Sequence, residues 1–313
     1  MRFIDVPTIF LSYAEDNADS NFELLRQQNP AAKRVHGVKG FDAAHRAASE
    51  KAKTLKATPF FITVDGDNEV IPDFWELDTE NIPPEFRLDT KAVLSWNAYN
   101  PMTGLCYGNG GLKIWTHSFI DSMVTHEQTE GKVVDFCWDP TYYQLQRIYS
   151  ITRPYGSARQ AFCAGFREGV KMPLVEGKPL DSVYETSGKA YRTNLHRLIT
   201  WCSVGAHLDR GGASIYGALY GFWSVHVKKT ISMEKVSDLN FIHDLHLELG
   251  NNKAEHTYPE AKTMRDDILS KTGIDIPAFG AKQSKFVVEA TRPYNLSQPF
   301  ERETWPSPID VKP

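Results

Sequence analysis

Cysteine and long apolar runs are both scarce in this chain of 313 residues. Its four cysteines are widely spaced and form no C-x-x-C pair, which is typical of free thiols in a reducing compartment. No apolar run is long enough to span a bilayer. The first residues, which include Asp5 and Pro7, lack the apolar core of a signal peptide. We therefore expect a cytoplasmic protein with no membrane partner.

A strong charge of either sign is also missing. The formal net charge is −4, so the chain as a whole is not a polycation, and any binding of nucleic acid must depend on a local basic patch. The apolar content of 41% is ordinary, and a chain of this length can bury a full core. These properties indicate one large domain or two small ones.

The most informative stretch is an apolar run that stops abruptly at two acids. Residues 60–64 are aromatic or β-branched, which predicts a buried strand. Asp65 and Asp67 follow at its C-terminal edge, where open α/β sheets place their ligands. Two carboxylates that point the same way can hold Mg²⁺ or Mn²⁺, and the cation can bridge a diphosphate. Gly66 would let the backbone approach that diphosphate closely.

Two other interpretations of this stretch remain open from the residues alone. The acids Asp65, Asp67, Glu69 and Glu76 have the spacing of an EF-hand calcium loop, but Val70 stands where that loop requires glycine. The stretch can also be a solvated turn that follows a strand, for which Asp-Gly-Asp-Asn is ordinary chemistry.

Strand and helix patterns alternate ahead of the two acids. Strands are predicted at residues 8–13 and 35–38, and helices at residues 21–28 and 41–55. This alternation predicts a parallel, Rossmann-like half, in which the loops after the first two strands face the same cleft as the acids.

The pattern beyond residue 70 is less regular. Residues 72–90 predict a surface loop, and residues 273–313 an extended tail. Further strands are predicted at residues 91–99 and 133–138, and helices at residues 161–170, 194–204 and 215–227. The type of the segment at 142–149 stays open.

Two polar passages interrupt these elements. In Tyr-Gly-Asn-Gly-Gly-Leu-Lys, residues 107–113, a Gly-Gly pair can expose backbone N–H groups and Lys113 can reach a phosphate, although a plain turn between strands fits as well. Residues 152–171 are locally basic, which fits either phosphate binding or solvated helix charge. The basic side chains of that passage are Arg153, Arg159, Arg167 and Lys171.

With these blocks in view, the chain resembles GT-A glycosyltransferases, and more narrowly the phage-encoded group associated with hydroxymethyl-pyrimidine DNA. The resemblance covers roughly residues 8–245. It rests on IFLSY at 9–13, VDGDN at 64–68, YGNGGLKIW at 107–115, GSARQAFCAGFREGVKM at 156–172, VGAHLD at 204–209 and YGALYG at 216–221.

The resemblance implies a fold class and a reaction. The fold would be α/β of the GT-A type, a Rossmann-like mixed sheet flanked by helices, with a helical C-terminal part and an extended tail. Its catalytic domain would span residues 1–230, with a nucleotide-sugar half at 1–115 and an acceptor half at 116–230. Residues 231–313 would pack on that domain.

The implied reaction moves arabinose or glucose from a UDP-sugar to 5-hydroxymethylcytosine in phage DNA, in the host cytoplasm. A carbohydrate or small-molecule acceptor is the alternative. A nucleotidylyltransferase is disfavoured, because the loop after the first strand is acidic rather than Gly-rich and basic. A DNA-binding or structural protein that has lost its metal site is the non-enzyme alternative.

The resemblance also implies residue roles. Asp65 and Asp67 would hold Mn²⁺ or Mg²⁺ on the donor diphosphate, with His207 as a third ligand and His226 as the substitute for it. The uridine and ribose would be bound by Ser12, Tyr13, Glu15, Lys39, Asp42 and Asp65. The donor sugar or phosphates would contact Asn109, Gly110, Gly111 and Lys113.

The catalytic side chains are less clearly indicated. An inverting transfer requires a base for the acceptor hydroxyl, and a carboxylate suffices. The candidates for that base are Glu168, Asp135 and Asp209, and Arg167 is the cationic side chain predicted beside them. The oligomeric state is not indicated by the sequence.

Overall fold

The structure is a computed structural model. It describes residues 1–86, 88–108, 111–123, 125, 136–175, 178–179, 189–249 and 259–303. These residues form two compact units, each of which is described by itself. Unit 1 contains Met1–Pro101, Cys106–Arg153 and Pro293–Glu303, and unit 2 contains Met102–Leu105 and Pro154–Arg292. The domain boundaries expected from the sequence stay a prediction.

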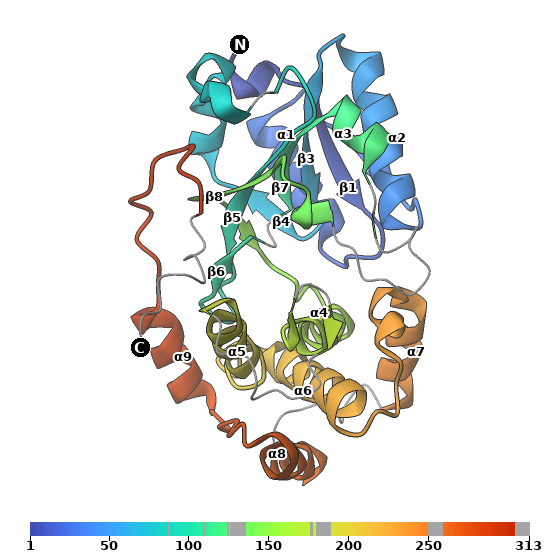
Figure 1. Ribbon diagram of the computed structural model, residues 1–313, viewed down its shortest axis with the longest axis vertical. Helices are drawn as coiled ribbons and strands as arrows, with labels where there is room; N and C mark the ends of the chain where they lie inside the picture. The colour runs from blue at the N-terminus through green and yellow to red at the C-terminus, as the bar shows by residue number, and fades with distance from the viewer. Residues whose placement is uncertain are drawn as a thin grey trace. The chain divides into compact units, whose positions relative to one another are not determined.

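Within the described residues, unit 1 is built on one mixed sheet (Figure 1). Its strand order is β2 (Lys33–His36), β1 (Thr8–Ser12), β3 (Phe60–Asp65), β7 (Leu112–Thr116), β5 (Val93–Tyr99), β8 (Tyr142–Thr152) and β4 (Asn68–Val70), with β6 (Cys106–Tyr107) paired to β5. Strand β1 is parallel to β2 and β3, whereas β7 is antiparallel to β3 and β5. Strand β5 is parallel to β8, and β4 is antiparallel to β8.

The predicted alternation of strands and helices is confirmed in the first part of the chain. Helix α1 (Ala18–Gln28) connects β1 to β2, and α2 (Phe41–Leu55) connects β2 to β3. Helix α2 lies beside α3 (His117–Ser122) in Figure 1, and both pack into one apolar cluster with the sheet. That cluster includes Ala48, Ala52, Phe119, Ile9, Leu11, Phe61 and Trp115. The expected α/β class, a mixed sheet flanked by helices with a helical C-terminal region, is therefore observed.

The opposite face of the sheet carries a second, larger apolar cluster, to which residues 72–90 contribute. The prediction of a surface loop there was wrong, because Phe74, Trp75 and Phe86 are buried. Phe74 and Trp75 lie on the short 3-10 helix η2 (Pro72–Glu76), and Phe86 lies on η4 (Pro84–Phe86). A third short 3-10 helix, η3 (Thr79–Asn81), lies between them in the chain. Phe74 contacts Trp96 of β5 edge to face, with ring centroids 5.2 Å apart. The prolines and acids that made this segment resemble a loop occupy its outer side and its turns.

Residues 293–303 return to unit 1 as an extended strap along β8. The backbone N–H of Gln146 donates to the carbonyl of Glu301 at 2.9 Å, and that of Glu303 donates to the carbonyl of Gln144 at 2.8 Å. The side chain of Asn295 both accepts from the N–H and donates to the carbonyl of Ile148, at 3.0 and 2.9 Å. The strap therefore satisfies backbone groups of β8 that β4 does not reach, since β4 pairs only with residues 150–152.

Unit 2 is mainly helical. Its described elements are α4 (Ala158–Lys171), β9 (Leu174–Val175), β10 (Lys178–Pro179), α5 (Lys189–Trp201), α6 (Gly211–Phe222), the π-helix η6 (Trp223–Val227), η7 (Met233–Ser237), α7 (Leu239–Glu248), α8 (Pro259–Thr272) and α9 (Ala281–Ala290). Ser157 caps α4, because its hydroxyl accepts from the N–H of Gln160. The extended tail expected from residue 273 was wrong for residues 281–290, which form α9.

Helices α4 and α6 pack backbone to backbone through four glycines. A Cβ on Gly165 or Gly169 would lie 2.0 Å from the carbonyl oxygen of Ser214 or 2.1 Å from that of Ala218. A Cβ on Gly217 or Gly221 would lie 2.3 or 2.4 Å from the carbonyl oxygens of Phe162 and Phe166. The two helices are thus closely packed, and only glycine fits at these crossing points.

One other expectation fails in part and lies in part outside the described residues. A strand was predicted over residues 133–138, but residues 136–138 form the 3-10 helix η5 (Phe136–Trp138), and the remainder lies outside the described residues. In the described part of the chain, no helix is long and apolar enough to cross a membrane.

Candidate functional site

The C-terminal ends of three parallel strands meet at one edge of the unit 1 sheet. Ser12 at the end of β1 is in register with His36 at the end of β2, and Leu11 is in register with Asp65 at the end of β3. The order β2–β1–β3 places the loops that follow these strands side by side. The residues expected to surround the acids, Ser12, Tyr13 and Glu15, are therefore at this edge.

Asp67 lies in the tight turn between β3 and β4 and is held by three polar contacts. Its Oδ1 accepts from the Asn68 side chain at 2.8 Å, and its Oδ2 accepts from the Thr152 hydroxyl at 3.3 Å. Its carbonyl accepts from the N–H of Arg153 at 2.8 Å. These contacts fix the carboxylate against the end of β8.

The electrostatic environment of Asp67 is unfavourable to a bare negative charge. Burial, together with the nearby carboxylates of Asp65 and Glu15, raises the pKa of Asp67 to about 7, although hydrogen bonds from Asn68 and Thr152 act in the opposite direction. A cation at this position would instead favour the charged form of Asp67, because it would attract the carboxylates of Asp67, Asp65 and Glu15.

Glu15 reaches this turn from the loop after β1. Its Oε2 accepts from the backbone N–H of Tyr13 at 2.7 Å, which holds the side chain back over the loop. A Cβ on Gly66 would lie 2.7 Å from the same oxygen, so the carboxylate lies directly on the glycine between the two acids. The structure therefore brings Glu15 to the two acids. The sequence had indicated only that it would bind uridine or ribose.

Gly111 approaches Asp65 from the neighbouring strand. The N–H of Asp65 donates to the carbonyl of Gly111 at 3.0 Å. A Cβ on Gly111 would lie 2.2 Å from the Cβ of Asp65, so no other residue fits at this position without a shift. Asn109 and Gly110, the other members of the predicted Gly-Gly turn, lie outside the described residues.

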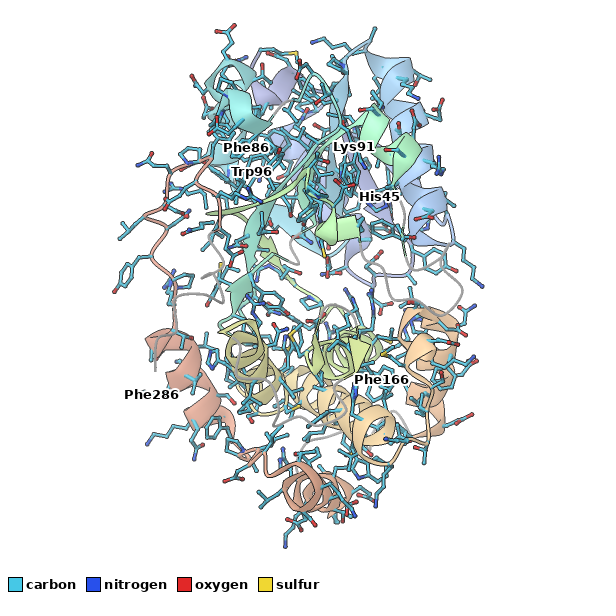
Figure 2. The ribbon with its side chains drawn as sticks, in the orientation of Figure 1. His45, Phe86, Lys91, Trp96, Phe166 and Phe286 are labelled. Carbon is cyan, nitrogen blue, oxygen red and sulfur yellow. The ribbon has the colours of Figure 1, made fainter. Side chains whose placement is uncertain are left out.

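Lys113 and Asp42 also belong to unit 1. Lys113 is buried on β7 and lies near His45 of α2. Burial, together with the charge of Lys113, lowers the pKa of that histidine to about 4. His45 projects from α2 toward the sheet, where its ring meets that of Trp115 with centroids 4.9 Å apart (Figure 2). Asp42, at the start of α2, accepts from the Thr125 hydroxyl at 2.8 Å. Lys39 is exposed in the loop before α2.

Sequence reasoning missed a polar cluster at the same sheet edge. Arg34 donates from Nε to the Ser12 hydroxyl at 2.7 Å and from Nη1 to Asp19 at 2.6 Å. Ser12 Oγ lies 2.9 Å from Nδ1 of His36. The spacing of Arg34 and His36, two residues apart on a strand, was the signal that could have identified them, because such side chains share a face.

The remaining predicted residues that the structure describes belong to unit 2. Glu168 is buried on α4, and Arg167 beside it has a buried Nε for which no hydrogen-bond partner is found among the described residues. Asp209 is exposed and His207 is half-buried, in the loop before α6. Asp135 lies outside the described residues. The roles of these side chains toward Asp65 and Asp67 of unit 1 stay predictions.

His226, the substitute considered for His207, has a structural contact of its own. Its Nε2 lies 2.8 Å from the carbonyl oxygen of Val170, near the C-terminal end of α4. A ring nitrogen that donates there satisfies one of the carbonyls that a helix end leaves open.

The residues at the D-G-D turn suit a divalent cation on a diphosphate better than a self-sufficient metal site. Among the described residues there is no group of three or more His, Cys, Asp or Glu side chains that could hold a metal ion. Magnesium in nucleotide enzymes is, however, bound through one or two carboxylates plus the phosphates of the substrate. A pair of acids at a strand end, with a third carboxylate nearby, has the oxygen donors that such an ion requires.

Comparison with known proteins adds little to this geometry. No protein-family model matches the chain, and no curated protein matches it. Among solved structures, the chain is similar to A197 from STIV, with 13% identity over 45% of this chain and 82% of that chain, and a TM-score of 0.31. These comparisons therefore assign no function to the chain.

Proposed function

We propose that the protein is a GT-A glycosyltransferase that transfers a sugar from a UDP-sugar donor and depends on Mn²⁺ or Mg²⁺. The observation that carries the proposal is the position of Asp67, half-buried beside Asp65 and Glu15 in the turn that follows a parallel strand. Three carboxylates gathered at a sheet edge are costly in the absence of a cation, and this edge is where α/β sheets bind nucleotides.

In this proposal Asp65 and Asp67 hold the cation. When bound, the ion neutralises the charge that develops on the departing diphosphate. Glu15 and Ser12 line the loop after β1, and Lys113 supplies a cationic side chain on β7. The carboxylate that accepts the proton of the acceptor hydroxyl is among Glu168, Asp209 and Asp135.

The acceptor belongs to the same proposal, as 5-hydroxymethylcytosine in DNA. It is supported by the sequence blocks at residues 107–115 and 156–172, which resemble those of the phage enzymes. It is also supported by the basic residues that begin at Arg153. Arg153 itself forms an ion pair with Glu69 at 3.0 Å, so phosphate contacts would fall to Arg159, Arg167 and Lys171.

A binding experiment with one matched pair of variants tests the donor and metal part. Titration calorimetry with UDP and Mn²⁺ should show binding to the wild-type protein and at least tenfold weaker binding to Asp67→Asn. Asp73→Asn, which removes an exposed acid of η2, should bind like the wild type. Failure of the wild-type protein to bind UDP in excess Mn²⁺ would refute the proposal.

A mass measurement tests the acceptor. The protein is incubated with Mn²⁺, a panel of UDP-sugars and DNA with or without hydroxymethylcytosine, and the nucleosides are then digested and weighed. A gain of one sugar mass on hydroxymethylcytosine alone is expected. Sugar transfer to a carbohydrate or small molecule, with unmodified DNA, would contradict the DNA assignment and leave the donor assignment in place.

A further inference from the structure

A row of polar side chains crosses the face of the unit 1 sheet that packs against α2 and α3, where the neighbouring side chains are apolar. Lys113 on β7 is in register with Thr63 on β3 and with Ser95 on β5, and Ser95 is in register with Gln144 on β8. Residues opposite each other on paired strands project from the same face. Thr63 and Ser95 are fully buried, and Lys113 nearly so.

This row leads toward the acids. Asp65 lies two residues beyond Thr63, and Asn97 two residues beyond Ser95, so both project from the same face as the row. Gly111 stands between them, with its carbonyl bonded to the N–H of Asp65 at 3.0 Å. A Cβ on Gly111 would lie 2.6 Å from Oδ2 of Asp65, so the carboxylate of Asp65 extends over this glycine.

The side-chain amides of Asn97 and Gln144, which belong to this row, are held in place by hydrogen bonds. Gln144 donates from Nε2 to Oδ1 of Asn97 at 2.8 Å and to the carbonyl of Ser95 at 3.1 Å. Its Oε1 accepts from the Tyr142 hydroxyl at 3.3 Å. Gly108 lies against the same amide, since a Cβ there would be 2.2 Å from Oε1. The pair is therefore rigid before any ligand arrives, which is what selective recognition requires.

One member of the surface lacks a partner. The Ser95 hydroxyl is fully buried, and no hydrogen-bond partner for it is found in the described part of the chain. The Oδ1 of Asn97 accepts a hydrogen bond from Gln144, so the Nδ2 of Asn97 is the group that can donate to a ligand. Buried polar groups are normally paired, so an unpaired hydroxyl beside a fixed amide indicates a ligand that brings hydroxyl groups of its own.

We propose that Asn97, Gln144 and Ser95 recognise the hydroxyl groups of the donor sugar and determine which UDP-sugar the protein uses. This inference rests on the proposed function. Neutral amides and a hydroxyl both donate and accept hydrogen bonds, as the vicinal hydroxyls of a sugar do. A phosphate would be bound by several cationic side chains, and this row contains one, Lys113. The diphosphate is assigned to the acids, and the sugar attached to it then falls on this adjoining surface.

Comparing the affinities for UDP and for UDP-sugars tests this assignment. Calorimetry with Mn²⁺ gives the Kd of UDP and of UDP-glucose, UDP-galactose and UDP-arabinose for the wild type, Asn97→Ala, Ser95→Ala and Gln146→Ala. Asn97→Ala should weaken the preferred UDP-sugar by about tenfold, the value of roughly one hydrogen bond, and leave UDP within twofold. Ser95→Ala removes only the unpaired hydroxyl, so it should fold normally and change the ranking of the sugars.

Gln146→Ala is the matched control, because its side chain donates to the carbonyl of Arg302 on the strap at 3.1 Å. It should alter neither affinity. Unchanged UDP-sugar affinities in both Asn97→Ala and Ser95→Ala, with UDP still bound, would overturn this inference alone. A wild-type protein that binds no UDP would instead overturn the proposed function, and this inference with it.

Discussion

The carboxylate of Glu15 lies directly on Gly66, the residue that separates Asp65 from Asp67. A Cβ at Gly66 would be 2.7 Å from Oε2 of Glu15 and 3.1 Å from the Cβ of Ser12. The loop after β1 and the turn after β3 are therefore in contact at the candidate site. A substitution at Gly66 should therefore change ligand binding at the site more than it changes the stability of the fold.

The substitution Gly66→Ala should weaken the binding of UDP with Mn²⁺ more than it destabilises the protein. The Glu15 side chain can swing aside, so the free energy of unfolding should fall by only about 1 kcal/mol. The displaced carboxylate should nevertheless cost several-fold in UDP affinity, measured by calorimetry. The double variant Gly66→Ala/Glu15→Ala should unfold like Glu15→Ala. A large additional loss of stability would show that Glu15 is not the side chain that yields.

The stability of the protein without metal should depend on the protonation of Asp67. Its pKa is raised to about 7 in the folded protein, against about 3.9 in an unfolded chain, so the folded state holds the proton more tightly. The contribution to stability is complete below pH 4 and is lost as the pH rises through 7. It amounts to a few kcal/mol, because one pKa unit corresponds to about 1.4 kcal/mol.

Urea unfolding of the wild type and Asp67→Asn in EDTA, at a series of pH values between 4 and 8, measures this contribution. The wild type should lose stability relative to the variant over this range. Mn²⁺ with UDP should restore it. Parallel pH profiles for the two proteins would contradict the prediction.

The contact between α4 and α6 should not tolerate a methyl group. Gly217→Ala would place a Cβ 2.3 Å from the backbone carbonyl of Phe162, and neither backbone can move without separating the helices. We expect the free energy of unfolding to fall by about 3 kcal/mol, because the higher helix propensity of alanine offsets the steric clash only in part. Gly280→Ala is the control, because a Cβ there meets only the end of the Gln283 side chain at 3.2 Å. A melting temperature of Gly217→Ala equal to that of the control would contradict this description of the packing.

The strap should contribute to stability through Phe300. Its ring lies 6.3 Å from those of both Phe3 and Trp96, and the indole N–H of Trp96 donates to the carbonyl of Pro299 at 2.8 Å. Phe300→Ala should lower the free energy of unfolding by about 2–3 kcal/mol in a urea titration. Leu296→Ala on the same strap should have no effect, because that side chain is 82% exposed. Equal effects of the two substitutions would indicate that the strap is not anchored through its aromatic ring.

The sequence predicted the parts of the fold that local pattern controls. The strand at residues 60–64 and the helix at 41–55 have clear periodicity, and both are present. Residues 72–90 were misjudged because their prolines and acids mask the buried Phe74 and Trp75, which only tertiary packing makes apparent. The helix at 281–290 was missed for the same reason, since it lies within a polar, Pro-rich segment.

The candidate site was predictable only where residues are neighbours in sequence. Asp65 and Asp67 could be paired from their spacing, whereas the approach of Glu15 to Gly66 joins residues 51 positions apart in the chain. The row from Thr63 to Gln144 depends on strand order and register, which no local pattern specifies.

The strap along β8 also determines when this protein can be completed during synthesis. The sheet that carries Asp65 receives its last hydrogen-bonded segment from residues 293–303, after Pro154–Arg292 of the helical unit has been made. A ribosome that has translated as far as residue 292 therefore holds a sheet in which β8 has an open edge. An open strand edge of this kind is prone to aggregation and is a binding site for chaperones until the strap has been synthesised.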